Sequence, residues 1–532
     1  MGVLSSAWKP LLFTLAGLAL ALWWWLGSGD TSVAPEATDR TTPIPSGHLP
    51  ATESAHALST PNAPDATFAT GLEEVSSVIV RFANDASRIA FLRVWEKQFP
   101  GSSRSFHPLG ATRLNLSSPA ARQFLREHFP PDAEWLFNPV MTRPVNPDFE
   151  AIPETAYQSF AEGIRAWLEI PEEVTQWGRG VMVAVLDTGL TSHTWPSLDL
   201  VERPLATNGP THGQVVSLLL AGSDGLAPAA DLLTVRVLDE AGRGDVFTVA
   251  EGIIRAVDQG ARILNLSLGG PEDHPLLREA VDYATRRGAV LIAAAGNEGR
   301  DGLSFPAAYP EVLAVGAIDA DRQHAHFSNR GQVALTAPGV GVGIPLDSET
   351  RALMSGTSAA TPIVTGAVAA LVSQFPGMTP AEAVRVLTAN ADDAGPAGPD
   401  DRWGAGVLNL DRALHHHLPG RHDPAIADLY LHPEPDPEGR FRLEVAVQNR
   451  GTSWTDNLRL RIQVGGDPVL TPRQTLALEA GESTGFSLYL DPARLQSEEG
   501  LTVRAMVDHP TLEDLRPGNN QKTAVFTLDP AE

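Results

Sequence analysis

The sequence predicts an α/β domain in which helices flank a parallel sheet, preceded by a small α+β domain and followed by an all-β sandwich. Val181–Leu186 is a near-continuous apolar run, which is typical of a central parallel strand, and it ends in Asp187. Small, apolar, helix-like runs follow His212 and Ser358. Beyond residue 424 the chain changes to short alternating segments separated by turns, which is typical of an antiparallel sandwich.

The N-terminus is predicted to carry an export signal, with a buried soluble helix as the less favoured alternative. Lys9 precedes an apolar run, Pro10–Leu26, that is long for a signal-peptide core and short for a membrane span. The run ends with Trp23–Trp25, where aromatic residues at a membrane–water interface would be expected. Residues 1–29 are therefore read as a cleaved signal peptide or an uncleaved signal-anchor. Both place the rest of the chain in the periplasm or outside the cell, and residues 10–26 could anchor it to the membrane.

Residues 30–70 are rich in Pro, Ser, Thr and Ala and lack periodicity, so we expect a disordered linker. Residues 71–145 have their own pattern and are predicted to be a small α+β domain. Its expected elements alternate between strand and helix: 78–82 strand, 85–99 helix, 111–116 strand, 118–129 helix with Pro119 in its first turn, and 134–141 strand.

Three residues in the central part of the chain carry chemistry. Asp187 follows a strand, His212 begins a helix, and Ser358 lies at a helix N-terminus, where free N–H groups favour negative charge. Gly356 lets the backbone approach a substrate, and Pro362 is expected in the first helical turn. Alone, Ser358 could be an ordinary N-capping serine. Together, in the order Asp, His, Ser, the three residues match the chain order of the subtilisin triad.

With further motifs, residues 155–415 resemble the subtilisin-like serine proteases, or subtilases, and residues 150–418 are assigned to such a peptidase domain. The matching segments include Ala293–Gly299, Asn265–Gly270 and Asp401–Asn409. The resemblance implies that Ser358 is the nucleophile, His212 the general base and Asp187 its orienting carboxylate. It implies oxyanion donation by Asn297. It also implies that peptide substrates pair with exposed backbone at Ser267, Leu268, Gly269, Gly270, Ala295 and Gly296, with Ser304 and Glu298 near the far end of the specificity pocket.

The segment around His212 departs from the family pattern. Thr211 stands where glycine is usual, Gln214 where threonine is usual, and Leu218 where a small residue is usual. The stretch from Asp187 to His212 is also short. No catalytic group is lost, so the departures bear on the shape of the cleft and on the orientation of His212.

Composition limits the partners and cofactors. The net charge of −25 argues against nucleic acid as a partner, and the absence of cysteine excludes disulfides and thiol chemistry. Triad chemistry needs no metal. A structural calcium ion is left open, with Asp508, Glu513, Asp514 and Asn519 as candidate ligands. His415–His417 are read as surface residues at a helix end rather than a metal tract.

The two flanking domains have different expected roles. The 71–145 domain looks like the inhibitory propeptide of the family, which covers the cleft and assists folding, with a processing site between Val140 and Glu154. An adaptor that is never removed is the alternative. Residues 424–530, joined by a short linker after Pro419, resemble a CARDB-type or immunoglobulin-like sandwich that binds or positions a partner.

The sequence thus predicts an exported serine endopeptidase that hydrolyses peptide bonds through an acyl-enzyme and processes itself as a zymogen. Its expected partners are peptide or protein substrates and its own N-terminal domain. One alternative is an inactive subtilase scaffold whose sandwich mediates binding or adhesion. Another is an acyl hydrolase of esters, which would need the same triad.

Overall fold

The structure is a computed structural model that describes residues 72, 75–144, 158–161, 163–170, 174–191, 194–202, 204–205, 209–346, 350–472, 475–496 and 500–528. The apolar run Pro10–Leu26 and the linker at 30–70 lie outside these residues, so the signal, the anchor and the linker stay predictions. Within the described part of the chain, no helix combines the length and the apolar character needed to cross a bilayer.

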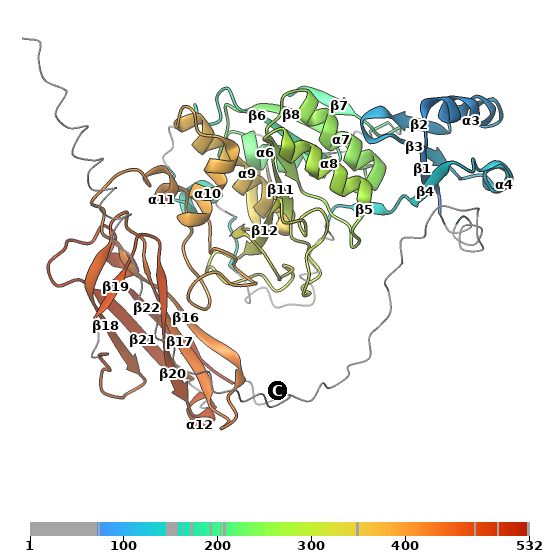
Figure 1. The fold of residues 1–532 in the computed structure, drawn as a ribbon. Helices are drawn as coiled ribbons and strands as arrows, with labels where there is room; N and C mark the ends of the chain where they lie inside the picture. Colours follow the sequence, from blue (N-terminus) through green and yellow to red (C-terminus); the bar gives the residue numbers. More distant parts are fainter. Residues whose placement is uncertain are drawn as a thin grey trace, which may run out of the picture. The chain divides into compact units, whose positions relative to one another are not determined.

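A seven-stranded sheet forms the centre of the molecule, and every neighbouring pair of its strands is parallel. This confirms the predicted α/β fold class (Figure 1). In spatial order the strands are β13 (Leu335–Pro338), β12 (Val312–Ile318), β11 (Val290–Ala294), β10 (Ile263–Leu266), β6 (Met182–Asp187), β8 (Asp231–Arg236) and β7 (Ser197–Asp199).

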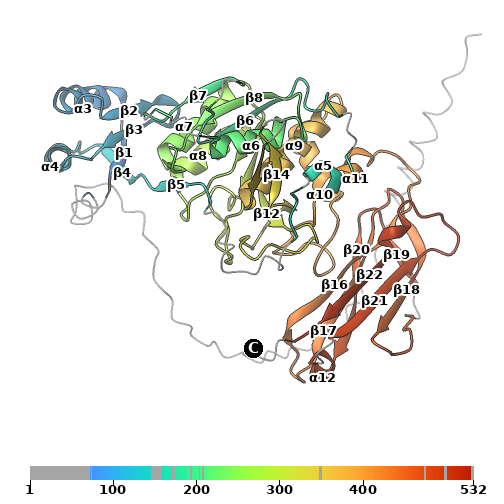
Figure 2. The ribbon, with the colours of Figure 1, turned by 180° about the vertical axis from the view of Figure 1, so that it is seen from behind.

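Helices cover both faces of this sheet, which explains the continuous apolar runs of its strands (Figure 2). Side chains alternate between two cores: Val183 and Val185 of β6 face one core, and Ala184 and Leu186 face the other. The first core holds α6 (His212–Ala221) and α9 (Thr357–Gln374), and the second holds α7 (Val246–Asp258) and α8 (Pro275–Arg286). Peripheral elements are α5 (Ile164–Trp167), α10 (Pro380–Ala389), α11 (Leu410–Leu414) and the hairpin of β14 (Val342–Pro345) and β15 (Arg351–Met354).

The N-terminal domain is a four-stranded antiparallel sheet of order β2-β3-β1-β4. Two predicted features need correction: an unforeseen strand, β2, lies at one edge, and the single strand expected at 134–141 is two strands in different sheets. The elements are β1 (Ser77–Phe82), α3 (Asp85–Gln98), β2 (Ser103–Phe106), a 3-10 turn η1 (His107–Leu109), β3 (Ala111–Asn115), α4 (Pro119–His128), β4 (Ala133–Phe137) and β5 (Val140–Thr142). Pro119 does begin α4, with Ser118 as its cap.

The N-terminal sheet is docked on α7 and α8. One face packs on α3 and α4 around the buried Trp95. The other contributes Ile79 and Phe106 to the same apolar core as the two peptidase helices. Ion pairs surround this contact: Arg113 to Asp245 at 3.0 Å, Arg104 to Glu251 at 2.9 Å and Arg81 to Glu279 at 2.6 Å.

The C-terminal domain is an antiparallel two-sheet sandwich around a single apolar core, as its alternating segments predict. Its assignment to the CARDB type stays a prediction. One sheet contains β16 (Pro424–Pro435), β17 (Phe441–Asn449) and β20 (Ser483–Leu490). The other contains β19 (Leu476–Leu478), β18 (Thr455–Val464), β21 (Leu501–Asp508) and β22 (Gln521–Phe526), with the short helices α12 (Pro492–Leu495) and η3 (Pro517–Asn519) at the loops.

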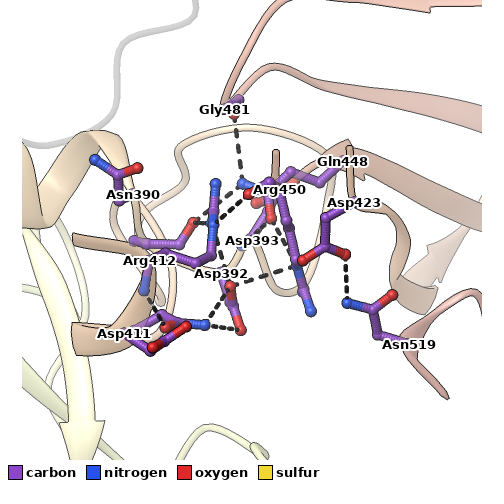
Figure 3. Close-up of polar contacts among 12 residues, drawn as sticks. Asn390, Asp392, Asp393, Asp411, Arg412, Asp423, Gln448, Arg450, Gly481 and Asn519 are labelled. Atoms are coloured by element: carbon purple, nitrogen blue, oxygen red, sulfur yellow. Dashed lines mark hydrogen bonds and ion pairs between the residues drawn. The ribbon is translucent and has the colours of Figure 1, made fainter. Parts of the chain in front are cut away.

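An ionic cluster around a buried carboxylate, here called the Asp392 cluster (Asp392, Arg322, Arg412 and Arg450), joins the sandwich to the peptidase domain. Figure 3 shows Asp392, Arg412 and Arg450 of this cluster. The Asp392 carboxylate lies 2.8 Å from Arg322, 3.2 Å from Arg412 and 3.4 Å from Arg450, the last being a residue of the sandwich. Burial alone raises the pKa of Asp392, but the charges of Arg450, Arg322 and Arg412 hold it well below its usual range.

Beside this cluster, the sandwich binds the main chain of a peptidase loop. Side-chain oxygens of Gln448, Asp428 and Glu444 accept the backbone N–H groups of Asp393 at 3.0 Å, Gly395 at 2.8 Å and Ala397 at 3.1 Å. These acceptors come from β16 and β17. The sandwich therefore satisfies backbone donors of the peptidase domain that its own residues leave open.

Candidate active site

Asp187 is the last residue of β6, where the strand reaches the carboxyl edge of the sheet. Its side chain is almost completely buried, and its Oδ1 accepts the backbone N–H of Thr188 at 2.6 Å. Burying a carboxylate is costly unless its oxygens accept hydrogen bonds. The strand therefore fixes an acceptor group at the edge of the sheet.

His212 is the first residue of α6, and its imidazole meets this carboxylate. Nδ1 lies 2.9 Å from both Oδ1 and Oδ2 of Asp187, and the imidazole side chain is 10% exposed. A carboxylate at Nδ1 holds the proton on that nitrogen and leaves Nε2 as the basic atom. The predicted pair is thus in contact, in the orientation that a general base requires.

Three polar contacts fasten the start of α6 to the loop after Asp187. Thr211 caps the helix and donates its hydroxyl to the Gly189 carbonyl at 2.6 Å. The Gly213 N–H donates to Thr188 Oγ1 at 2.9 Å, and Thr191 donates to the Gln214 side chain. Thr211 and Gln214 are two of the positions that depart from the family pattern, so here the departures orient His212 without loosening it.

Ser358 is the second residue of α9, and Gly356 is the N-cap, so the N-capping interpretation of Ser358 is wrong. Pro362 is also not in the first turn, because it lies inside the helix, five residues beyond its first residue Thr357. Ser358 is buried, and its Oγ donates to the Ser267 carbonyl at 3.4 Å. Helices α6 and α9 pack against each other on one face of the sheet.

Asn297 lies beside the start of α9 with a fixed amide orientation. Its Oδ1 accepts the backbone N–H of Thr357 at 2.9 Å and the Thr357 hydroxyl at 2.8 Å. Its Nδ2 then faces Gly356, where a Cβ would lie only 2.6 Å from that nitrogen. Gly356 has φ +123°, so a side chain there would be both strained and obstructed. This glycine makes room for Asn297.

The predicted substrate strand, Ser267–Gly270, follows β10 directly, but part of its backbone is already paired. Gly269 exchanges hydrogen bonds of 2.9 and 2.8 Å with Thr142 in an antiparallel bridge. On its other side, β5 pairs with β9 (Arg243–Asp245). The chain's own segment Val140–Thr142 therefore lies between two backbone edges in the manner of an added strand.

The remaining predicted binding residues gather at one wall. The Ala295 carbonyl accepts Ser304 N–H at 3.0 Å, and the Gly296 N–H donates to Thr357 Oγ1 at 3.3 Å. A Cβ on Gly296 would lie 2.7 Å from Ser304 Oγ and 2.8 Å from Glu298 Oε2, and one on Gly269 would lie 2.8 Å from Ser304 Cβ. Ser304 and Glu298 thus sit beside Gly296, and Ser304 also beside Gly269.

Two of the candidate calcium ligands contact protein groups through their side chains. Asp508 is paired with Arg459 and Arg461, and Asn519 donates to Asp423 at 2.8 Å. Among the residues with described positions, no group of three or more His, Asp or Glu side chains could hold a metal ion. His415 contacts Asp411, whereas His416 and His417 both lie against the Phe375 ring and against each other.

Sequence reasoning missed four residues of the site: Thr188, Thr357, Asn265 and Thr365. Each is buried, and each binds a predicted site residue or its helix through a side chain. A threonine or asparagine in an apolar stretch is a weak signal, since its partner is distant in the chain. Only the folded arrangement identifies that partner.

Comparisons with known proteins agree with this geometry. A family model described as the subtilase family matches residues 178–406. Subtilisin BL and Subtilisin Savinase, both from Lederbergia lenta, are each 36% identical over 250 residues, which cover 44% of this chain and 91% of theirs. An alkaline protease from Shouchella clausii is 36% identical over 250 residues, or 64% of its length.

Together with the family match and these relatives, a parallel sheet with an Asp–His contact at its carboxyl edge and a serine at a helix N-terminus identifies a serine-type endopeptidase. The chain belongs to the subtilase family.

Proposed function

We propose that this endopeptidase uses Asp187, His212 and Ser358 as its catalytic triad. Ser358 Oγ attacks the scissile carbonyl, His212 Nε2 takes the proton and returns it to the leaving amine, and Asp187 stabilises the charged imidazole. Asn297 Nδ2 and the Ser358 N–H hold the oxyanion. The observation that carries the proposal is the paired 2.9 Å contact of His212 Nδ1 with both Asp187 oxygens.

We further propose that the N-terminal domain is an intramolecular inhibitor that the enzyme cleaves. The support is β5, which pairs with β9 and Gly269 as a bound peptide would. Because Thr142 faces Gly269 in antiparallel register, each step toward Pro144 moves one residue back toward Ser267. Ser358 Oγ donates to the Ser267 carbonyl, so the register directs the chain near Pro144 at the nucleophile. We place the processing bond close to Pro144.

The substrates are proposed to be peptides or proteins bound in extended form along Ser267–Gly270, once β5 has left. Export, the anchor at residues 10–26 and a calcium ion are proposals that rest on the sequence alone. The chemistry needs no cofactor in this proposal. The sandwich would hold the peptidase domain, a role supported by the Asp392 cluster.

The test is labelling by a fluorophosphonate probe, which reacts with an activated serine. The full chain is incubated until any self-cleavage is complete, treated with probe and mapped by peptide mass spectrometry. We expect a single label on Ser358, and its loss in His212→Ala, because the base activates the hydroxyl. A wild-type chain without label, even after limited proteolysis removes β5, would favour the inactive scaffold.

Release of the N-terminal domain is expected to depend on pH through His274. His274 caps α8, accepting the Leu276 N–H at Nδ1 (3.2 Å), while its Nε2 donates to the carbonyl of Phe137 in β4 (3.0 Å). Burial, with the nearby charge of Arg81, lowers the pKa of this imidazole below its ordinary 6.5. The hydrogen bond to the Phe137 carbonyl and the charges of Asp273 and Glu272 act in the opposite direction but do not outweigh the burial. Protonation would place a proton on the nitrogen that accepts the cap bond.

The direction of the pH effect on docking follows from the lowered pKa of His274. When the domain leaves, the histidine is hydrated and its pKa returns toward 6.5, so docking is strongest above 6.5 and weakens as pH falls below it. We expect affinity to fall by up to about tenfold per pH unit, the limit for one proton. The measurement is the rate of fluorophosphonate labelling of Ser358 at each pH, in wild type and in His274→Gln. Dividing the two rates cancels any pH dependence that both proteins share through His212. A ratio that stays flat between pH 7 and pH 5 would refute the effect.

A further inference from the structure

The carbonyl of Ser358 lacks the donor that an α-helix normally provides. In a regular helix the N–H of residue i+4 donates to the carbonyl of residue i, and here that residue is Pro362, which has no N–H. The carbonyl belongs to the proposed nucleophile itself and is buried with it. An unpaired buried carbonyl at this point would leave the position of Ser358 poorly determined.

A side chain from the substrate segment supplies the missing donor. Ser267 Oγ donates to the Ser358 carbonyl at 3.1 Å. Asn265 Nδ2 donates to Ser267 Oγ at 3.1 Å, and the Thr365 hydroxyl lies 2.9 Å both from Asn265 Oδ1 and from the Thr361 carbonyl. All four residues are buried. The chain of bonds thus runs from the third turn of α9, through the end of β10, and back to the first turn of α9.

The Ser358 carbonyl, which can only accept a hydrogen bond, fixes the direction of the bonds that lead to it. A hydroxyl has one proton, so Ser267 can donate to the Ser358 carbonyl only if it accepts from Asn265. The reversed amide would direct the Ser267 proton at Asn265 and set lone pairs of the hydroxyl against the carbonyl oxygen. Asn265 therefore orients the Ser267 hydroxyl.

The same two residues also make the reverse contact, because Ser358 Oγ donates to the main-chain carbonyl of Ser267 at 3.4 Å. Ser267 thus holds the nucleophile through two atoms: its side chain binds the Ser358 carbonyl, and its carbonyl binds the Ser358 hydroxyl. The segment that pairs with an extended peptide is in this way joined directly to the attacking residue.

We propose that the Ser267 hydroxyl, oriented by Asn265, replaces the amide proton that Pro362 lacks and so positions Ser358 for attack. The proposal rests on the proposed function, since it assigns Ser267 and Asn265 as positioning residues for that nucleophile. This bond holds the main chain of Ser358, and so fixes both the attacking Oγ and the N–H group that is proposed to hold the oxyanion. Loss of the hydroxyl would let the first turn of α9 shift.

A rescue experiment tests this in the full chain. Ser267→Ala is expected to slow fluorophosphonate labelling and kcat by about tenfold with KM nearly unchanged, the effect of one unpaired buried acceptor. Adding Pro362→Ala restores a backbone N–H at the helical position, so the double variant should recover to within about threefold of Pro362→Ala alone. Ser217→Ala, which removes a buried hydroxyl of α6 that has no partner among the described residues, should change nothing.

The outcomes separate the two proposals. Labelling of Ser267→Ala at the wild-type rate, or a double variant as slow as Ser267→Ala, would overturn the positioning role while leaving the triad intact. A wild-type chain that does not label would overturn the proposed function instead. In that case, or if Ser267→Ala folds poorly, the thermal midpoints of wild type, Ser267→Ala, Pro362→Ala and the double variant decide. Rescue of the midpoint by Pro362→Ala supports the replaced amide, and no rescue refutes it.

Discussion

Replacing Ser358 by alanine is expected to lower peptide hydrolysis by about 10⁶-fold, the scale measured when the nucleophile of subtilisin itself is removed. The reason is the geometry at the start of α9. Ser358 is the second residue of the helix, beside Asn297, and alanine leaves that frame intact while removing the attacking oxygen. Binding of β5 to Gly269 uses backbone atoms and should persist. The variant chain should therefore keep its N-terminal domain covalently attached.

The measurement is hydrolysis of a peptide substrate together with intact mass after expression and incubation. Ser373→Ala is the matched control, because Ser373 lies at the other end of the same helix and its hydroxyl accepts from Gly178. It should retain both activity and cleavage. If wild type and Ser358→Ala release the domain equally, another protease cuts it. If neither hydrolyses peptide, the inactive scaffold is correct.

Replacing Asp392 by alanine is expected to destabilise the chain by about 3–5 kcal/mol, the cost of breaking a buried ion pair from one side. The carboxylate is 2% exposed and is the shared partner of Arg322, Arg412 and Arg450. Without it, three guanidinium groups repel one another near the domain interface. Because the pKa of Asp392 is held low, its contribution should persist at neutral pH and fade only in strong acid.

Chemical unfolding monitored by tryptophan fluorescence gives the free energy of unfolding. Asp401→Ala is the control, since Asp401 is exposed and lies nearby in the chain; its free energy should stay within about 0.5 kcal/mol of wild type. Arg450→Met removes the sandwich's member of the cluster and reduces the excess positive charge, so it should cost less than Asp392→Ala. A loss below about 1 kcal/mol for Asp392→Ala would show that the cluster does not stabilise the interface.

Local sequence patterns were sufficient to predict a helix or strand wherever the contacts that determine it are close in sequence. The apolar run at Val181–Leu186 predicts β6, and Ser118–Pro119 predicts the start of α4, because burial and capping leave local traces. Strand β2 was missed because its sequence, Ser-Arg-Ser-Phe, has little apolar alternation; Arg104 is fixed by Glu251, far along the chain. The segment 134–141 reads as one strand because the break at Asn138 depends on its bond to Phe247.

The triad residues were predicted from their type and order, and the remaining site residues from the family resemblance. The structure brings Asp187 and His212 into contact, and likewise Ser267 and Ser358. The buried contacts that hold these residues in place could not be predicted in the same way. Nothing in the sequence around Arg450 indicates that its guanidinium is buried against Asp392. The Ser267 hydroxyl matters because Pro362 lies inside α9, and a helix start misplaced by a few residues hides that relation.

The three backbone N–H groups that the sandwich accepts, at Asp393, Gly395 and Ala397, bear on how this protein can have been assembled in evolution. A domain that is merely appended can be exchanged or deleted at its boundary. Here the acceptors lie on one side of residue 420 and the donors on the other, with Arg450 and Asp392 divided in the same way. Deletion of either domain would leave unpaired polar groups on the other, so a substitution on one side of the junction is constrained by the residues on the other side.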